Sequence, residues 1–123
     1  MKVVATEKAP AALGPYSQAL DLGDFVFVSG QIPVDPATGK MADTVEAQAA
    51  QSFANVKAIL EKAGLTMASV VKTTVFLSEL ADFAAVNAVY EKYFCAPYPA
   101  RSCVQVAAIP KGAKLETECI ARR

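Results

Sequence analysis

The chain has 123 residues, with 12 Lys and Arg against 12 Asp and Glu, and it contains no histidine. This length predicts one domain with its own core, and the balanced charge argues against nucleic acid or anionic membranes as partners. The lack of histidine excludes Ser-His-Asp and Cys-His nucleophile pairs and the usual zinc and non-haem iron sites, so no such metal site is expected. Hydrophobic residues make up 54% of the chain, which is high for so small an interior, and we therefore expect an oligomer.

Hydrophobic periodicity and turn residues predict the secondary structure in chain order. The expected elements are a weak strand at 2–5, a hairpin of strands 17–21 and 25–29, a helix from 43 to 63, a strand at 70–77, a helix at 82–94 with Phe83, Val86, Tyr90 and Tyr93 or Phe94 inward, and strands at 101–107 and 114–121. Asp43 and Glu46 resemble a capping box at the start of the first helix, and Gly64 follows its end. This order predicts a single α+β domain over residues 1–123, with a mixed, mostly antiparallel sheet and two helices on one face.

The cysteines Cys95, Cys103 and Cys119 show no CxxC spacing, and their odd number argues against a disulfide framework. For Cys95 and Cys119 the simplest interpretation is a small buried hydrophobe in a reducing compartment. We find no signal segment and no apolar run of membrane-spanning length, so the expected location is the cytoplasm.

Arg101 follows two prolines, Pro97 and Pro99, which stop a helix and favour an extended backbone. It opens an alternating strand pattern in which Arg101 and Cys103 share a face. A guanidinium at a strand end is a planar fork of donors suited to binding a carboxylate at two points. From the residues alone, an arginine in a salt bridge or in water is an equally good interpretation.

The last predicted strand places Glu116 and Glu118 on the same face as Ile120. The simpler interpretation is the solvated face of an edge strand. If this strand were the neighbour of the Arg101 strand, a carboxylate could approach the guanidinium.

Several blocks of the sequence stand in the order of a known family. These blocks are Gly14–Ala19, Ser29–Pro33, Asn55–Lys57, Val71–Leu77, Pro99–Ser102 and Glu116–Glu118. From about Ala5 to Arg122 the chain resembles the reactive-intermediate deaminase (Rid, formerly YjgF) family, and it looks most similar to the imine/enamine deaminase branch.

The resemblance implies a chorismate-mutase-like fold and a homotrimer with sites in the clefts between subunits. It implies hydrolysis of 2-imino (enamine) acids, such as 2-iminobutanoate and 2-iminopropanoate, to 2-keto acids and ammonia without a cofactor. Pyridoxal-phosphate dehydratases would supply these substrates, with no stable complex expected.

The resemblance also implies roles for single residues. Arg101 matches the arginine that binds the substrate carboxylate, Glu116 matches the glutamate that positions the attacking water, and Cys103 matches a cysteine that lines the pocket. The positions that match cleft residues from the neighbouring subunit are Tyr16, Ser29, Gly30 and Asn87.

Two other functions stay open. A trimer could bind 2-keto or other small carboxylic acids without turnover and act as a regulator, and relatives have been described as endoribonucleases or translation inhibitors. The zero net charge and the lack of histidine argue against the ribonuclease. Only Cys95–Tyr98 stand between Phe94 and Pro99, where many relatives have a longer loop, so the preferred substrate side chain is open.

Overall fold

The computed structural model describes all 123 residues and has the predicted fold class. Its strands are β1 (Lys2–Val4), β2 (Ala19–Asp21), β3 (Phe25–Gln31), β4 (Val70–Leu77), β5 (Ala100–Gln105) and β6 (Leu115–Arg122). Its helices are α1 (Val45–Lys62) and α2 (Phe83–Tyr93), with short 3-10 turns at Met67–Ser69, Leu80–Asp82 and Pro110–Gly112.

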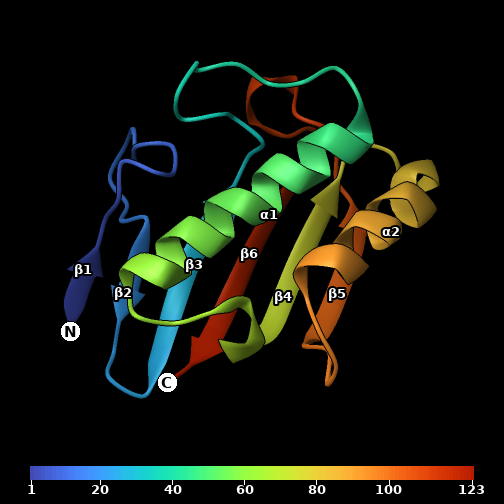
Figure 1. Ribbon diagram of the computed structural model, residues 1–123. Coiled ribbons are helices and arrows are strands. Elements are labelled where there is room, and N and C mark those ends of the chain that lie inside the picture. The colour runs from blue at the N-terminus through green and yellow to red at the C-terminus, as the bar shows by residue number, and fades with distance from the viewer.

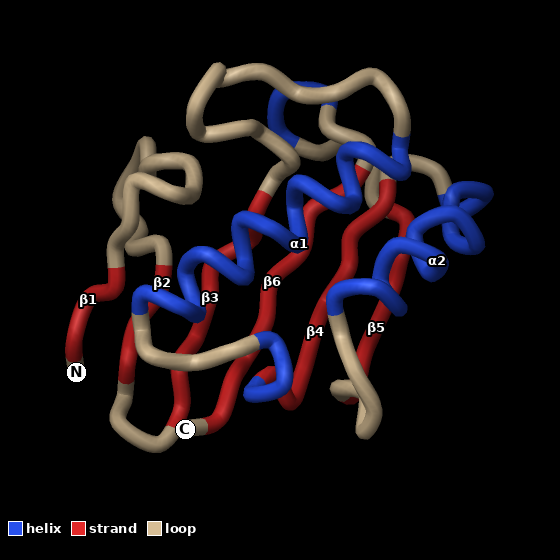
Figure 2. The backbone as a smooth tube through the Cα atoms, viewed as in Figure 1, coloured by secondary structure: helices blue, strands red, loops and turns tan.

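The strands form one sheet in the order β1-β2-β3-β6-β4-β5. Every neighbouring pair is antiparallel except β4 and β5. These two strands run parallel, and the chain segment that joins them contains α2. Figures 1 and 2 show α1 and α2 lying side by side across the same face of this sheet. The sheet is therefore mixed and mostly antiparallel with both helices on one face, as the order of elements predicted.

Helix α1 is held at both ends by residues of the expected kind. The Thr44 hydroxyl accepts a hydrogen bond of 3.2 Å from the Ala47 amide, so the N-cap is Thr44 and not Asp43. At the other end Gly64 has φ of +78°, the left-handed conformation that commonly ends a helix. The inner face of α1 is fully buried against the sheet at Phe53, Ile59 and Leu60.

Helix α2 packs beside α1 through an aromatic cluster. The Phe53 ring meets Tyr90 edge-on at 5.6 Å between centroids, and Tyr90 stacks on Phe94 at 4.1 Å. The prediction that Phe83 points inward is wrong, because its side chain is 39% exposed at the start of α2. There its ring lies against the Arg101 guanidinium, 5.4 Å from centroid to carbon, instead of entering the core.

Strand β6 lies inside the sheet, between β3 and β4. The interpretation of Glu116 and Glu118 as the solvated face of an edge strand is therefore wrong. The alternation itself is confirmed, since Leu115 and Thr117 are fully buried under the helices while Glu116 and Glu118 point to the face without helices. The strand that begins near Arg101 ends at Gln105, two residues before the predicted end.

Candidate functional site

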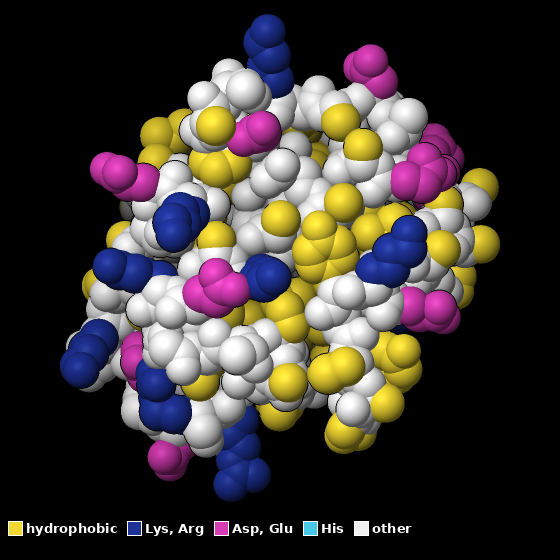
Figure 3. Space-filling model, in the orientation of Figure 1, with side chains coloured by type: hydrophobic (Ala, Val, Ile, Leu, Met, Phe, Trp, Pro, Cys, Tyr) yellow, Lys and Arg dark blue, Asp and Glu magenta, His cyan; other side chains and the backbone are white.

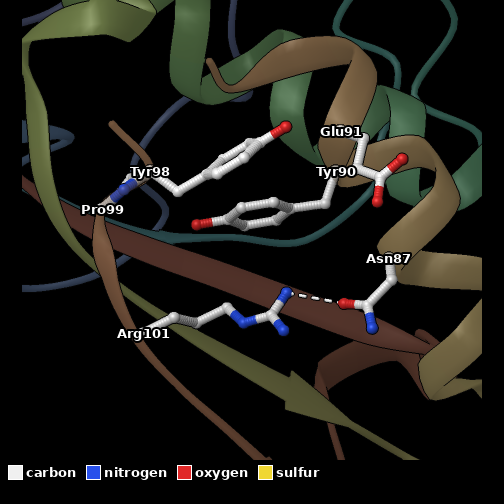
Figure 4. A pocket seen from close by; sticks show the side chains of 6 residues that line it. All are labelled: Asn87, Tyr90, Glu91, Tyr98, Pro99 and Arg101. Atoms are coloured by element: carbon white, nitrogen blue, oxygen red, sulfur yellow. Dashed lines mark hydrogen bonds between the residues drawn. The ribbon is translucent and has the colours of Figure 1, made fainter. Parts of the chain in front are cut away.

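A cavity of about 430 Å³ opens between α2 and the edge strand β5 (Figure 4). Its lining residues are Asn87, Tyr90, Glu91, Tyr98, Pro99 and Arg101. The first three share one face of α2, because they stand three and four residues apart. Figure 3 shows hydrophobic side chains gathered over the connection from α2 to β5, and Tyr98 in that connection is 54% exposed. One wall of the cavity mouth is thus apolar.

Arg101 supplies the positive charge of this cavity. Its Nη1 donates a hydrogen bond of 2.7 Å to Asn87 Oδ1, and its guanidinium carbon lies 4.7 Å from the centre of the Tyr90 ring. Neither of the two ion pairs in the structure involves Arg101. A guanidinium has five N–H donors, so most of them stay free for an anion, and a carboxylate fits their geometry.

Cys103 lies two residues along β5 from Arg101 and packs against the core. Burial raises the pKa of the Cys103 thiol, an effect that the positive charge of Arg101 partly opposes. The thiol is therefore protonated at neutral pH and is a poor nucleophile. Cys119 is still more buried, with a pKa raised to about 12.

Glu116 belongs to a second group of side chains, on the face of the sheet without helices. It lies so close to Gly30 that a Cβ on residue 30 would be 2.0 Å from Glu116 Oε1. Burial and, less strongly, the negative charge of Glu118 raise the pKa of the Glu116 carboxyl. A carboxylate with a raised pKa is a stronger base for a water molecule than an ordinary surface glutamate.

Tyr16 and Ser29 lie next to this second group. Tyr16 and Gly30 line one cavity of about 360 Å³, and the Ser29 hydroxyl donates a hydrogen bond of 2.6 Å to the Ser17 carbonyl. Tyr16 is 53% exposed. Gly30 thus lies both in the cavity that Tyr16 lines and against the Glu116 side chain, with Ser29 next to it in the chain.

The two groups do not meet within one chain. Arg101 pairs with Thr73 on the helix-covered face, while Glu116 pairs with Phe76 on the opposite face, and β4 separates their strands. The idea that neighbouring strands would bring a carboxylate to Arg101 is therefore wrong. Asn87 lies beside Arg101 of its own chain, whereas the resemblance implied that the neighbouring subunit contributes it.

Three residues that line the cavity were not predicted to do so. Tyr90 was predicted as a core side chain, and it is both core and cavity wall, while Glu91 and Tyr98 had no predicted role. The available signal was the spacing of Asn87, Tyr90 and Glu91 on one helical face just before the proline-flanked arginine.

Two further features bear on the class of site. No group of three or more His, Cys, Asp or Glu side chains is placed to hold a metal ion. Neither helix is long and apolar enough to cross a bilayer.

Comparison with known proteins supplies the family. Residues 6–123 match the family described as Endoribonuclease L-PSP. A 2-iminobutanoate/2-iminopropanoate deaminase from Salmonella typhimurium is 60% identical over an alignment of 125 residues. The alignment covers 99% of this chain and 98% of that protein.

Two solved structures from E. coli cover the whole chain. TdcF with bound serine has a TM-score of 0.96 at 50% identity, covering 100% of this chain and 99% of that one. The YjgF gene product also has a TM-score of 0.96, at 54% identity with the same coverage. On sequence and fold together, the chain belongs to the Endoribonuclease L-PSP family, which is the YjgF/Rid family that the motif blocks indicated.

Proposed function

We propose that this protein is a 2-iminobutanoate/2-iminopropanoate deaminase. The observation that carries the proposal is the Arg101 guanidinium, which lines a cavity without a carboxylate partner of its own. The relative of that name from Salmonella typhimurium, 60% identical over nearly the whole chain, supports the choice of substrate. The apolar wall at Tyr98 suits the short aliphatic side chain of such an acid.

The chemistry needs only groups that this chain has. A protonated imine is already electrophilic, so water attacks its carbon without a metal or a covalent nucleophile. The resulting amino alcohol then expels ammonia and leaves the 2-keto acid. The protein must orient the substrate and accept a proton from the water. Arg101 would hold the substrate carboxylate through paired charge-assisted hydrogen bonds, and Glu116 would accept the proton.

We propose further that the active unit is a homotrimer with a chorismate-mutase-like arrangement and its sites between subunits. One subunit would contribute Arg101 and Asn87, and the next would contribute Glu116 with Gly30, Ser29 and Tyr16. The separation of Arg101 and Glu116 on opposite faces of one sheet supports this arrangement.

The face without helices gives independent support for the trimer. It leaves Phe25, Phe27 and Val104 between 41% and 44% exposed in a single chain. Aromatic and branched side chains in one exposed surface are typical of a subunit interface.

The proposed setting is the cytoplasm, because all three cysteines are free thiols, which fits a reducing compartment. Pyridoxal-phosphate dehydratases would release the substrates there. No stable complex with those enzymes is needed, since the imine reaches the cavity by diffusion.

A non-catalytic trimer that binds small carboxylic acids is the second candidate. Arg101 would serve a binder equally well, so Glu116 discriminates the two functions. A partly buried carboxylate beside an anionic ligand weakens binding, whereas hydrolysis requires a base. Glu116→Gln is therefore expected to spare 2-keto acid binding and to impair turnover, and the reverse pattern would favour the binder.

The test is 2-keto acid release from an imine generated in situ by a serine or threonine dehydratase, with a nucleophilic imine trap competing. Wild-type protein is expected to accelerate release, and Arg101→Ala is not. Equal acceleration by both proteins would remove Arg101 from the site. No acceleration by either, with 2-keto acid binding retained, would establish the binding module.

A further inference from the structure

The Arg101 guanidinium is held by more than one contact. Its carbon lies 4.7 Å from the Tyr90 ring centre and 5.4 Å from the Phe83 ring centre, both within cation–π range. Figure 4 shows the guanidinium beside the Tyr90 ring, with its Nη1 turned toward Asn87. The ring contact fixes the position of the guanidinium, and the Asn87 bond fixes its rotation.

The Tyr90 ring is itself fixed. Its hydroxyl shares a hydrogen bond of 2.8 Å with the Thr73 hydroxyl, in which either group can donate. Thr73 is fully buried on β4 and is the direct cross-strand partner of Arg101 on β5. Phe53 closes one side of the ring edge-on, and Phe94 stacks on it.

Burial raises the pKa of the Tyr90 hydroxyl, which the Thr73 bond and the charge of Arg101 partly oppose. The hydroxyl therefore stays protonated and neutral, and the ring presents its electron-rich face to the guanidinium.

We propose that Tyr90 is a positioning residue for the reaction. Its ring stacks against the Arg101 guanidinium and is held in place by the hydrogen bond to Thr73. The guanidinium is therefore ordered before the substrate binds, with its free donors directed to where a carboxylate would bind. This inference rests on the proposed function, in which Arg101 anchors the substrate. An unsupported arginine side chain would lose its rotamer freedom on binding, and prior ordering removes that cost from the binding step.

The proposal predicts that removal of the Tyr90 ring lowers the affinity of the site for a carboxylate. Tyr90→Leu is expected to raise the dissociation constant for pyruvate and the KM for the imine by about tenfold, which lies between the effects of an exposed and a fully desolvated cation–π contact. Tyr90→Phe keeps the ring face and loses the Thr73 bond, so it is expected to recover most of that loss. Thr73→Val removes the same bond from the other side and is expected to match Tyr90→Phe.

A core residue would also destabilise the protein when truncated, so the decisive test changes the electrons of the ring and not its size. Phenylalanine with zero, one, two or three fluorines is placed at position 90, and pyruvate binding is measured by calorimetry alongside the melting temperature. Each fluorine weakens the negative face of the ring, so the dissociation constant is expected to rise stepwise while the melting temperature does not fall in parallel. The matched control is the same series at Phe94, which stacks on Tyr90 and has no cation–π contact with Arg101.

Two outcomes overturn the proposal in distinguishable ways. If Arg101→Ala weakens pyruvate binding and the fluorine series at position 90 is flat, Tyr90 is a core residue only, and the proposed function stands. If Arg101→Ala binds pyruvate as well as the wild type does, Arg101 is not the anchor and this inference fails. The proposed function is then decided separately, by whether the wild-type protein accelerates 2-keto acid release from the imine.

Discussion

The close approach of Gly30 to Glu116 predicts that Gly30→Ala disables the proposed base without unfolding the protein. A Cβ on residue 30 would lie 2.0 Å from Oε1 and 2.8 Å from Cδ of Glu116. Atoms cannot remain at those separations. The obstructing atoms belong to the end of a flexible side chain, so the Glu116 carboxylate must rotate away while the backbone stays in place.

The expected sizes follow from that displacement. Forcing a side chain off its preferred rotamer costs about 0.5–1.5 kcal/mol, which lowers the melting temperature of a domain this size by a few degrees. A positioned general base contributes about 10²–10⁴-fold to rate. We therefore expect Gly30→Ala to lower kcat/KM by at least about a hundredfold, or roughly 2.7 kcal/mol of barrier, which is far more than its effect on stability.

The assay is 2-keto acid release from dehydratase-generated imine, with circular dichroism melting run on the same samples. The double variant Gly30→Ala/Glu116→Gln is the internal control. Because both changes remove one base, their effects on kcat/KM are expected not to add. Wild-type turnover in Gly30→Ala, or additive losses in the double variant, would refute the role assigned to Glu116.

Three other expectations can be checked with the same protein. Arg101→Ala is expected to lower kcat/KM, measured by steady-state kinetics, by about 10²–10⁴-fold, because two hydrogen bonds to a charged group are lost at about 1.5–3 kcal/mol each. Arg101→Lys is expected to restore little of this activity, because an ammonium group lacks the planar set of donors of a guanidinium. Burial and, less strongly, the charge of Glu118 raise the pKa of Glu116 above its ordinary value of 4.5. Because the base must be ionised, kcat/KM is expected to rise as the pH rises through that raised pKa. In a pH–rate profile, Glu118→Gln should move this rise to lower pH, and an unchanged profile would contradict the effect assigned to the Glu118 charge. Phe27→Glu places a charge where an apolar side chain is 44% exposed in one chain. Gel filtration is expected to show a folded monomer, and this monomer is expected to have no deaminase activity. An intact, active oligomer would exclude this face as the interface.

The faces of the elements could be predicted from the sequence. The alternation over 114–121 correctly put Glu116 and Glu118 on one face of the strand, opposite the buried Leu115 and Thr117. Such patterns depend only on residues two apart, because successive strand residues point to opposite faces. The first helix was also predicted, with its N-cap placed one residue too early at Asp43, since polar capping residues and Gly64 mark the ends of a helix locally.

The neighbours of each strand could not be predicted in the same way. Strands β5 and β6 follow each other along the chain, yet β4 lies between them. Pairing depends on which arrangement buries Leu77 and Leu115 under the helices, and that is a property of the whole fold. For the same reason Tyr90, typical of a core position by its spacing, also forms a wall of the cavity.

The placement of Arg101 and Glu116 on opposite faces has a chemical consequence if the site forms between subunits. An Arg–Glu ion pair inside one chain would occupy the donors meant for the substrate and would lower the pKa of the base. The sheet prevents that pairing within a single chain, because β4 and the full thickness of the backbone lie between the two side chains. A separated subunit would then keep the Arg101 cavity, with Asn87 and Tyr90 still in contact with the guanidinium. It would bind a carboxylate and lack the base for hydrolysis, so in the proposed trimer assembly would add the catalytic step to a binding site that each chain carries alone.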